Sequence, residues 1–293
     1  MQMKLKKLGA KTYIIDSQNK VGIYLINEID VVIIDTGLGE SSGKEIMEIC
    51  NSQNWQIKMV LNTHSHPDHI GGNHIIQKTL NVKIYAPKTE IVFIENPELT
   101  NNISYGGNPH KYLNSPYLVP KASVASKLTK EILPEGLEYF DLPGHNSQMV
   151  GFKTSDDIYF LADAVAGEDI ITKYELQFTY DIQKQLKTLD YIKSLHGKLF
   201  VPSHGDDFTN NKHIVKLNYD NTINIINNIK KICSNKATFE TILKHIFEIY
   251  NLKMDFIQYS LIGVTIKGYL TYMLNNDMLK VEFTENEQFW ITL

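Results

Sequence analysis

The apolar positions in the first third of the chain fall into short runs that alternate with helical patterns. Runs rich in β-branched residues and bounded by polar or glycine residues predict strands. They occur at residues 11–17, 21–27, 31–37, 57–63 and 82–86. Apolar residues with helical spacing predict helices between these strands. They occur at residues 41–54, 71–80 and 88–95. Strands that alternate with helices favour an α/β fold.

The second half of the chain repeats this order and then changes character. Further strands are predicted at 137–142, 148–154, 157–163 and 198–205, with a helix at 181–195. From about residue 211, long helical patterns dominate, at 213–232, 238–250 and 256–274, and residues 279–293 read as a β-hairpin. Three helices followed by a hairpin is the order of a winged-helix module. We therefore expect a catalytic domain over 1–210 and a helical, winged-helix-like domain over 211–293.

Residues 96–136 have neither a helical nor a strand period and are dense in Asn, Pro, Gly and Tyr. A long irregular segment in a compact domain is more often a functional loop than an arbitrary one, so we expect it near the active site. Four of its side chains either line a substrate pocket or pack the loop against the body of the protein. They are Tyr105, His110, Tyr112 and Tyr117.

Composition narrows the class of protein. The chain has 293 residues, of which 43% are hydrophobic, yet no apolar run approaches the ~20 residues of a membrane span. No secretory leader is predicted at the start, and Cys50 and Cys233 are expected to be buried, unpaired thiols, which fits the cytoplasm. The net charge is −4 and all 29 basic residues are lysine. No guanidinium clamp on phosphate or carboxylate is therefore available.

The stretch VLNTHSHPDHIGGNH, residues 60–74, places His64, His66, Asp68 and His69 directly after a predicted strand. Imidazole and carboxylate groups are ligands for zinc and similar ions. Two imidazoles two residues apart can face one ion, but one ion does not easily accept all four side chains from a single turn. The pattern therefore predicts two ions.

Three further candidate ligands follow other predicted strands. They are His145, Asp163 and His204. In open α/β sheets, ligands gather beyond the strand ends, so these side chains are expected to converge on the histidine-rich turn. His74, His196, His213 and His245 lack such a context and are expected to be surface or packing residues.

The residues THSHPDH, 63–69, resemble the HxHxDH motif of the metallo-β-lactamase fold superfamily. VVIIDTG, DLPGH, LADA and VPSHG resemble its other motifs in order, so the resemblance covers about residues 10–210. It implies a four-layer αββα sandwich with a binuclear metal site at one edge. Two residues depart from the usual pattern: Asn146 follows the GH histidine in place of Ser or Thr, and no helper arginine exists.

The resemblance also implies a role for each candidate residue. The first metal takes His64, His66 and His145, and the second takes Asp68, His69 and His204. Asp163 is similar to the carboxylate that bridges the two ions, and Asp35 is similar to a residue that braces the ligand loop. Zinc is the expected metal, although these ligands also accept iron or manganese.

Two such ions can share a water and lower its pKa to ~7. We therefore expect a dinuclear hydrolase whose bridging hydroxide attacks an ester, thioester or lactone carbonyl of a small substrate, with Asp68 orienting the water or accepting its proton. The segment 96–136 and the C-terminal region would form the pocket walls. The resemblance implies that true β-lactamases usually lack the bridging aspartate, which argues against that activity. It also implies basic glutathione contacts in hydroxyacylglutathione hydrolases, and the sequence does not locate them.

Two alternatives remain open at the level of sequence. The first is a metal-dependent nuclease or phosphodiesterase. Residues 211–254 contain seven lysines and three acidic residues, and this excess of positive charge could bind phosphates. A solvated helix face explains these lysines better. The second alternative is a metal-sensing or nucleic-acid-binding regulator that catalyses no reaction. A homodimer is also compatible with the sequence.

Overall fold

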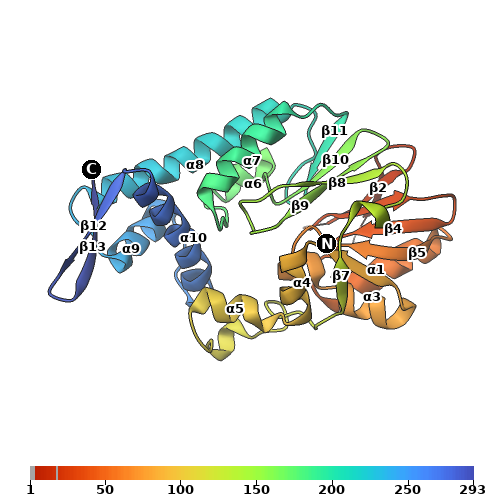
Figure 1. Ribbon diagram of the computed structural model, residues 1–293, viewed down its shortest axis with the longest axis horizontal. Coiled ribbons are helices and arrows are strands. Elements are labelled where there is room, and N and C mark those ends of the chain that lie inside the picture. Colours follow the sequence, from red (N-terminus) through yellow and green to blue (C-terminus); the bar gives the residue numbers. More distant parts are fainter. Residues whose placement is uncertain (1–3, 18) are drawn as a thin grey trace.

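The computed structural model describes residues 4–17 and 19–293. It contains a seven-stranded sheet and a four-stranded sheet that face one another, with helices on both outer faces (Figure 1). The first sheet has the order β1-β2-β3-β4-β5-β6-β7 and the second has the order β11-β10-β9-β8. The predicted αββα sandwich is thereby confirmed.

The first sheet is antiparallel from β1 to β4 and parallel from β4 to β7. Its strands are β1 (Lys4–Lys7), β2 (Thr12–Asp16), β3 (Val21–Leu25), β4 (Asp30–Ile34), β5 (Gln56–Leu61), β6 (Lys83–Ala86) and β7 (Ala125–Lys127). In the second sheet only β10 and β11 are parallel. Its strands are β8 (Leu137–Asp141), β9 (Val150–Thr154), β10 (Ile158–Ala162) and β11 (Leu199–Pro202).

Alternating side chains along the strands separate the core into layers, because successive residues of a strand point to opposite faces. Ile14 and Val32 pack between the sheets with Phe152 and Phe160 of the second sheet. Their neighbours in sequence, such as Ile15 and Ile33, pack on the other face with helices. The helices of that layer are α1 (Gly39–Ser52), α3 (Asn73–Leu80) and α4 (Lys88–Glu95).

The outer face of the second sheet is covered by helices that extend into the C-terminal region. They are α7 (Ile182–Ser194) and α8 (Asn211–Cys233), and the short helix α6 (Glu168–Lys173) packs against α8. After α8 come α9 (Phe239–Ile249), α10 (Phe256–Asn275) and the hairpin of β12 (Leu279–Thr284) and β13 (Glu287–Thr292). The order of three helices and a hairpin is as predicted. One hydrophobic cluster joins Leu161 and Leu189 to Ile225, Ile246 and Ile266, so the core continues across residue 210.

The segment 96–136 is more regular than the sequence predicts. It contains α5 (Glu98–Tyr105), the 3₁₀ turns Lys111–Leu113 and Lys130–Ile132, and β7. The sequence of α5 lacks the apolar spacing of a helix because its buried residue, Asn101, is polar. The Asn101 side chain donates a hydrogen bond to the Leu113 carbonyl oxygen. The helix begins after Pro97 and ends at Gly106, whose φ of 82° closes it. The strand β1 and the helix α6 were also not predicted.

Two simpler predictions concern the thiols and the membrane. Cys50 and Cys233 are both buried and unpaired, and burial raises the pKa of each thiol to about 12, as expected for inert packing residues. Over residues 4–17 and 19–293, the helices are all too short or too polar to cross a bilayer.

Candidate metal centre

The ends of four strands bring the candidate residues to one edge of the sandwich. Asp35 follows β4 and His64 follows β5, and these two strands are parallel neighbours. Asp163 follows β10 and His204 follows β11, which form a parallel pair in the other sheet. The carboxyl ends of both pairs therefore face the same edge, as predicted.

The turn after β5 is held by side-chain amides. Asn62 and Asn73 exchange hydrogen bonds of 2.8 and 3.3 Å, and Asn62 also donates to the His69 carbonyl oxygen at 3.2 Å. Pro67 begins the single-turn helix α2 (Pro67–Ile70), where its missing N–H costs nothing. At Gly71 a Cβ atom would lie 2.0 Å from the Gly39 nitrogen, so only glycine permits this close approach.

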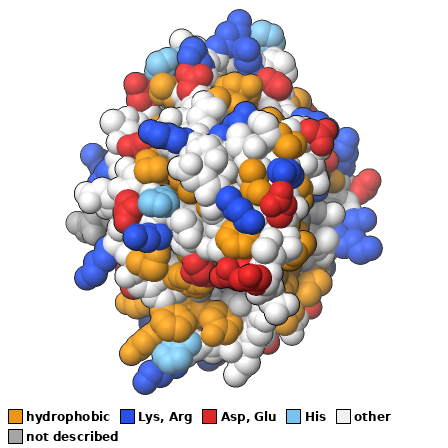
Figure 2. Space-filling model, turned by 90° about the vertical axis from the view of Figure 1, so that its left-hand side faces the viewer, with side chains coloured by type: hydrophobic (Ala, Val, Ile, Leu, Met, Phe, Trp, Pro, Cys, Tyr) orange, Lys and Arg blue, Asp and Glu red, His pale blue; other side chains and the backbone are white. Residues whose placement is uncertain are grey.

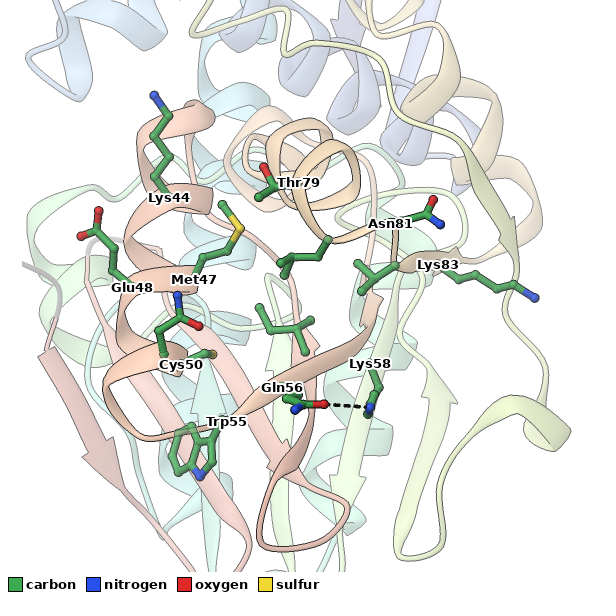
Figure 3. A pocket seen from close by; sticks show the side chains of 14 residues that line it. Lys44, Met47, Glu48, Cys50, Trp55, Gln56, Lys58, Thr79, Asn81 and Lys83 are labelled. Atoms are coloured by element: carbon green, nitrogen blue, oxygen red, sulfur yellow. Dashed lines mark hydrogen bonds between the residues drawn. The ribbon is translucent and has the colours of Figure 1, made fainter.

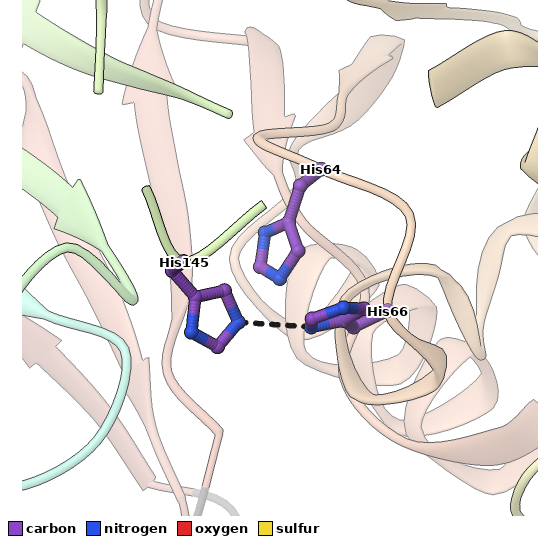
Figure 4. A group of neighbouring side chains, drawn as sticks. All are labelled: His64, His66 and His145. Carbon is purple, nitrogen blue, oxygen red and sulfur yellow. Dashed lines mark hydrogen bonds between the residues drawn. The ribbon is translucent and has the colours of Figure 1, made fainter. Parts of the chain in front are cut away.

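His64, His66 and His145 form the first group, and their ligand atoms lie within 4.8 Å of one another. The three rings point toward a common centre (Figure 4). His145 Nε2 lies 2.9 Å from His66 Nδ1, and the buried His64 Nε2 has no hydrogen-bond partner among the described residues. A buried imidazole nitrogen without a partner, facing two others, fits a metal ion.

Asp68, His69, Asp163 and His204 form the second group, also within 4.8 Å. His204 Nε2 lies 3.3 Å from both Asp68 Oδ2 and Asp163 Oδ2, and His69 Nε2 lies 3.2 Å from Asp163 Oδ1. Asp163 Oδ2 is also 3.4 Å from His145 Nε2 of the first group. This carboxylate therefore lies between the two groups.

Asp35 is buried beneath both groups and fixes the tautomers of two histidines. The Thr63 hydroxyl donates to Asp35 Oδ2 at 2.7 Å, so it accepts the Nδ1 proton of His64 at 3.0 Å. His69 Nδ1 donates directly to Asp35 Oδ2 at 2.9 Å. Both rings thus direct Nε2 away from Asp35 and into the site, the arrangement in which a metal-bound histidine donates its other N–H to a fixed partner.

The two groups differ in charge. Burial lowers the pKa of His64 and lowers that of His66 to about 3, so both imidazoles are neutral at neutral pH. Burial also disfavours the charged form of His204, but Asp163 and Asp68 outweigh it and raise its pKa to about 10. The second group thus attracts positive charge, and a divalent ion there would displace protons.

Glu90 of α4 is a residue that the sequence analysis missed. It is fully buried, and its Oε2 accepts hydrogen bonds from the Ser65 nitrogen at 3.0 Å, the Ser65 hydroxyl at 2.6 Å and Asn146 Nδ2 at 3.1 Å. It thus ties the His66 loop to the His145 loop. A signal was present, because Glu90 shares the buried face of its helix with Ile94.

A pocket of about 210 Å³ opens beside His66. Its walls include Phe93 of α4, Ile103 of α5, Phe178 and Val264 of α10. The four aromatic candidates of 96–136 are not among its lining residues. Tyr105, Tyr112 and Tyr117 are exposed, and His110 stacks on Phe256 at the start of α10, with ring centroids 4.9 Å apart.

A wider surface pocket of about 830 Å³ lies elsewhere (Figure 3). Lys44, Trp55 and Lys83 are among its lining residues, together with the first residues of β5. It lies at the opposite end of β5 from His64 and includes none of the candidate ligands. It is therefore separate from the metal centre.

Comparison with known proteins agrees with this geometry. A family model for the metallo-beta-lactamase superfamily matches residues 20–204. A probable metallo-hydrolase of Bacillus subtilis is 27% identical over 194 residues, which is 64% of this chain and 81% of that protein. A hydroxyacylglutathione hydrolase of Prochlorococcus marinus is 26% identical over 191 residues, 61% of this chain and 65% of that protein.

Among solved structures, a metallo-beta-lactamase family protein from Thermus thermophilus has a TM-score of 0.74 at 14% identity. The match covers 100% of this chain and 99% of that one, so the similarity in fold includes the C-terminal helices. The family match spans most of the chain and contains all seven candidate ligands. The chain therefore belongs to the metallo-beta-lactamase superfamily and is a metal-dependent hydrolase.

Proposed function

We propose that the protein is a dinuclear hydrolase that cleaves an ester, thioester or lactone carbonyl of a small substrate. The observation that carries this proposal is the position of Asp163, whose Oδ2 lies 3.4 Å from His145 Nε2 and 3.3 Å from His204 Nε2. A carboxylate in this position can hold two ions at a fixed separation. The donor set of five imidazoles and two carboxylates suits zinc, iron or manganese, and we propose zinc.

In this proposal His64, His66 and His145 hold one ion, and Asp68, His69 and His204 hold the other. When bound, such a pair lowers the pKa of a shared water and polarises a substrate carbonyl. Asp35 supplies the orientation of the ligand histidines through the hydrogen bonds described above.

Asp68 is proposed to orient the attacking water and to accept its proton. Its side chain is 28% exposed, whereas that of Asp163 is 9% exposed, so Asp68 is the more accessible carboxylate of the site. Asn19 donates a hydrogen bond to Asp68 Oδ2 and thereby holds its orientation. A carboxylate that is fixed and partly solvated can accept a proton and release it to solvent.

The test replaces one residue of each group. With the protein loaded with zinc, His66→Ala and Asp68→Ala are each expected to lower kcat/KM by about a thousandfold or more, because each removes several kcal/mol of transition-state stabilisation. His245→Ala is the matched control, since His245 is exposed on α9 and pairs with Glu248 of its own helix at 2.9 Å. Wild-type kcat/KM in folded His66→Ala or Asp68→Ala protein would refute the proposal.

The nuclease alternative has less support. Of the lysines in 211–254, Lys216, Lys236 and Lys244 pair with acidic side chains. On the face shown in Figure 2, the lysines are scattered among acidic and apolar side chains and do not gather in one patch. This distribution is typical of a solvated helix surface and provides no continuous track for a phosphate backbone.

Four further expectations stay predictions. They are the boundary at residue 210, a winged-helix character of the C-terminal region, a homodimer and a location in the cytoplasm. A site closed to substrate would have favoured the non-catalytic regulator, but the pocket beside His66 leaves space for a substrate.

A further inference from the structure

We infer that the substrate carries one uncharged, apolar group of about six to eight non-hydrogen atoms, and that this group occupies the pocket beside His66. The inference rests on the proposed function, because it names the substrate class for the same site. It concerns the part of the substrate that does not react.

The position of the pocket connects it to the metal centre. His66 belongs both to the pocket wall and to the first ligand group. The ring of Phe178, also in the wall, lies edge-on to His66 and His145, with centroids 5.2 and 5.4 Å away. The Phe178 carbonyl oxygen accepts the Nδ1 proton of His145 at 3.0 Å. A group in the pocket would therefore place an attached carbonyl beside the first group.

The chemistry of the walls favours an apolar occupant. Phe93, Ile103, Phe178 and Val264 come from four separate segments and present aromatic or aliphatic surface. The polar part of the wall consists of His66, Tyr180 and uncharged hydroxyl and amide side chains such as Ser104 and Asn146. Lysine, aspartate and glutamate are absent from the lining residues of the described chain, and the sequence has no arginine. A carboxylate that entered this pocket would lose its water without meeting a cation, which is costly.

The size of the pocket limits the occupant. An apolar cavity of about 150 Å³ binds benzene, and this pocket measures about 210 Å³. A phenyl ring or a chain of six to eight carbons therefore fits. The charged glutathione moiety in the name of the relative from Prochlorococcus marinus fits this chain's pocket less well, because it is larger and carries carboxylates.

The experiment measures kcat/KM of the zinc-loaded protein on methyl acetate, butanoate, hexanoate and octanoate, by proton release at constant pH. Hexyl acetate tests whether the alkyl chain that the pocket binds belongs to the acyl part or to the alcohol part of the ester. We expect kcat/KM to rise about fourfold per added methylene. Hexanoate, with four more methylenes, should therefore exceed acetate by about 250-fold, and the increase should end near octanoate. A rate independent of chain length on both sides, or S-lactoylglutathione cleaved faster than every apolar ester, would overturn the inference.

A pocket-filling variant locates the effect. Val264→Trp is expected to reduce the hexanoate-to-acetate ratio at least tenfold, because the indole occupies the space of the chain. Leu274→Trp is the matched control: Leu274 lies on the same helix, is 37% exposed and does not line the pocket, so the ratio should stay as in wild type. An unchanged ratio in Val264→Trp would contradict the inference.

A second readout does not depend on turnover. The inert ketone 2-octanone should cause saturable NMR shifts of the Ile103 and Val264 methyl groups, and Leu274 should not respond. Shifts without hydrolysis of any ester would support the pocket and refute the proposed reaction. Ester hydrolysis without such shifts would support the reaction and refute the pocket assignment.

Discussion

Asp35 shows how one residue can organise the whole site. Its backbone has a φ of 60°, in the left-handed region that aspartate tolerates better than most residues. This turn directs the carboxylate under the ligand loop, where it contacts Thr63 and His69. Through these two residues it orients His64 of the first group and His69 of the second.

Glu90 illustrates what the motif did not predict. It is a buried carboxylate whose partners are two loops distant in sequence, so only the folded chain reveals its role. We expect Glu90→Ala to weaken zinc binding at the first group by about 10- to 100-fold, as for other residues that orient ligands. Glu90→Gln should remain close to wild type, because its amide oxygen can accept the bonds of Ser65 and Asn146.

Zinc affinity measured by competition with a chelator, together with circular dichroism, checks this expectation. Glu98→Gln, at an exposed position of α5, serves as the control. If folded Glu90→Ala binds two zinc ions as tightly as wild type, Glu90 does not position the histidines.

At the scale of elements, the parallel pairs β4–β5 and β10–β11 determine where the ligands meet, and neighbouring helices hold the loops. Asn218 of α8 is buried, and it accepts from the Ala166 nitrogen and donates to the Ala166 oxygen, both at 3.0 Å. The loop after Asp163 is thereby fixed by a helix that begins after residue 210. No pattern in the sequence indicated this link, since Asn is common throughout α8.

The link can be tested by Asn218→Ala. It leaves a buried N–H and C=O of Ala166 without partners, which should cost about 1–3 kcal/mol of stability and weaken zinc binding at the second group. Asn227→Ala is the control, because Asn227 is exposed on the same helix. Thermal unfolding and zinc titration measure both effects. Equal stability and equal zinc affinity in the two variants would remove Asn218 from this role.

The turn between β9 and β10 ties the two sheets together at the end away from the metal centre. Asp156 accepts hydrogen bonds from the Ala10 and Lys11 nitrogens at 3.1 and 2.8 Å and from the Thr12 hydroxyl at 2.7 Å. These bonds outweigh burial and lower the pKa of Asp156. A carboxylate whose pKa is lower in the folded than in the unfolded state stabilises the folded protein at pH values above the unfolded-state pKa of ~3.8. This contribution is lost as the pH falls through the folded-state pKa.

Asp156→Asn should therefore unfold at a lower temperature than wild type at pH 7, and the difference should shrink as the pH falls below about 4. Asp157→Asn, one residue further along the same turn and exposed, is the control and should unfold close to the wild-type temperature. Thermal unfolding followed between pH 3 and pH 7 measures the difference. If the difference in unfolding temperature between wild type and Asp156→Asn stayed constant over this range, the charge of Asp156 would not contribute to stability.

For the whole molecule, the sequence predicted the order of layers, the ligand loops and a pocket wall from the C-terminal region, but not which residues of that region form the wall. The sequence shows that Ile14 and Ile15 face opposite sides of a strand and that an apolar strand leads into His64. Both can be predicted because periodicity and motifs involve residues that are close in sequence. The return of α10 to α5 (Figure 1), which places Val264 beside the pocket, depends on long-range packing. Of the two readings left open for the aromatic residues of 96–136, His110 follows the second, because it stacks on Phe256 and so packs the segment against α10.

The central claim is that seven side chains from distant parts of the chain hold two metal ions. Its most direct test is a crystal structure of the zinc-loaded protein with anomalous scattering recorded at the zinc edge. The account predicts two peaks about 3.5–4 Å apart, one bound by His64, His66 and His145, the other by Asp68, His69 and His204, with Asp163 contacting both. A single peak, or two peaks that Asp163 does not connect, would contradict it.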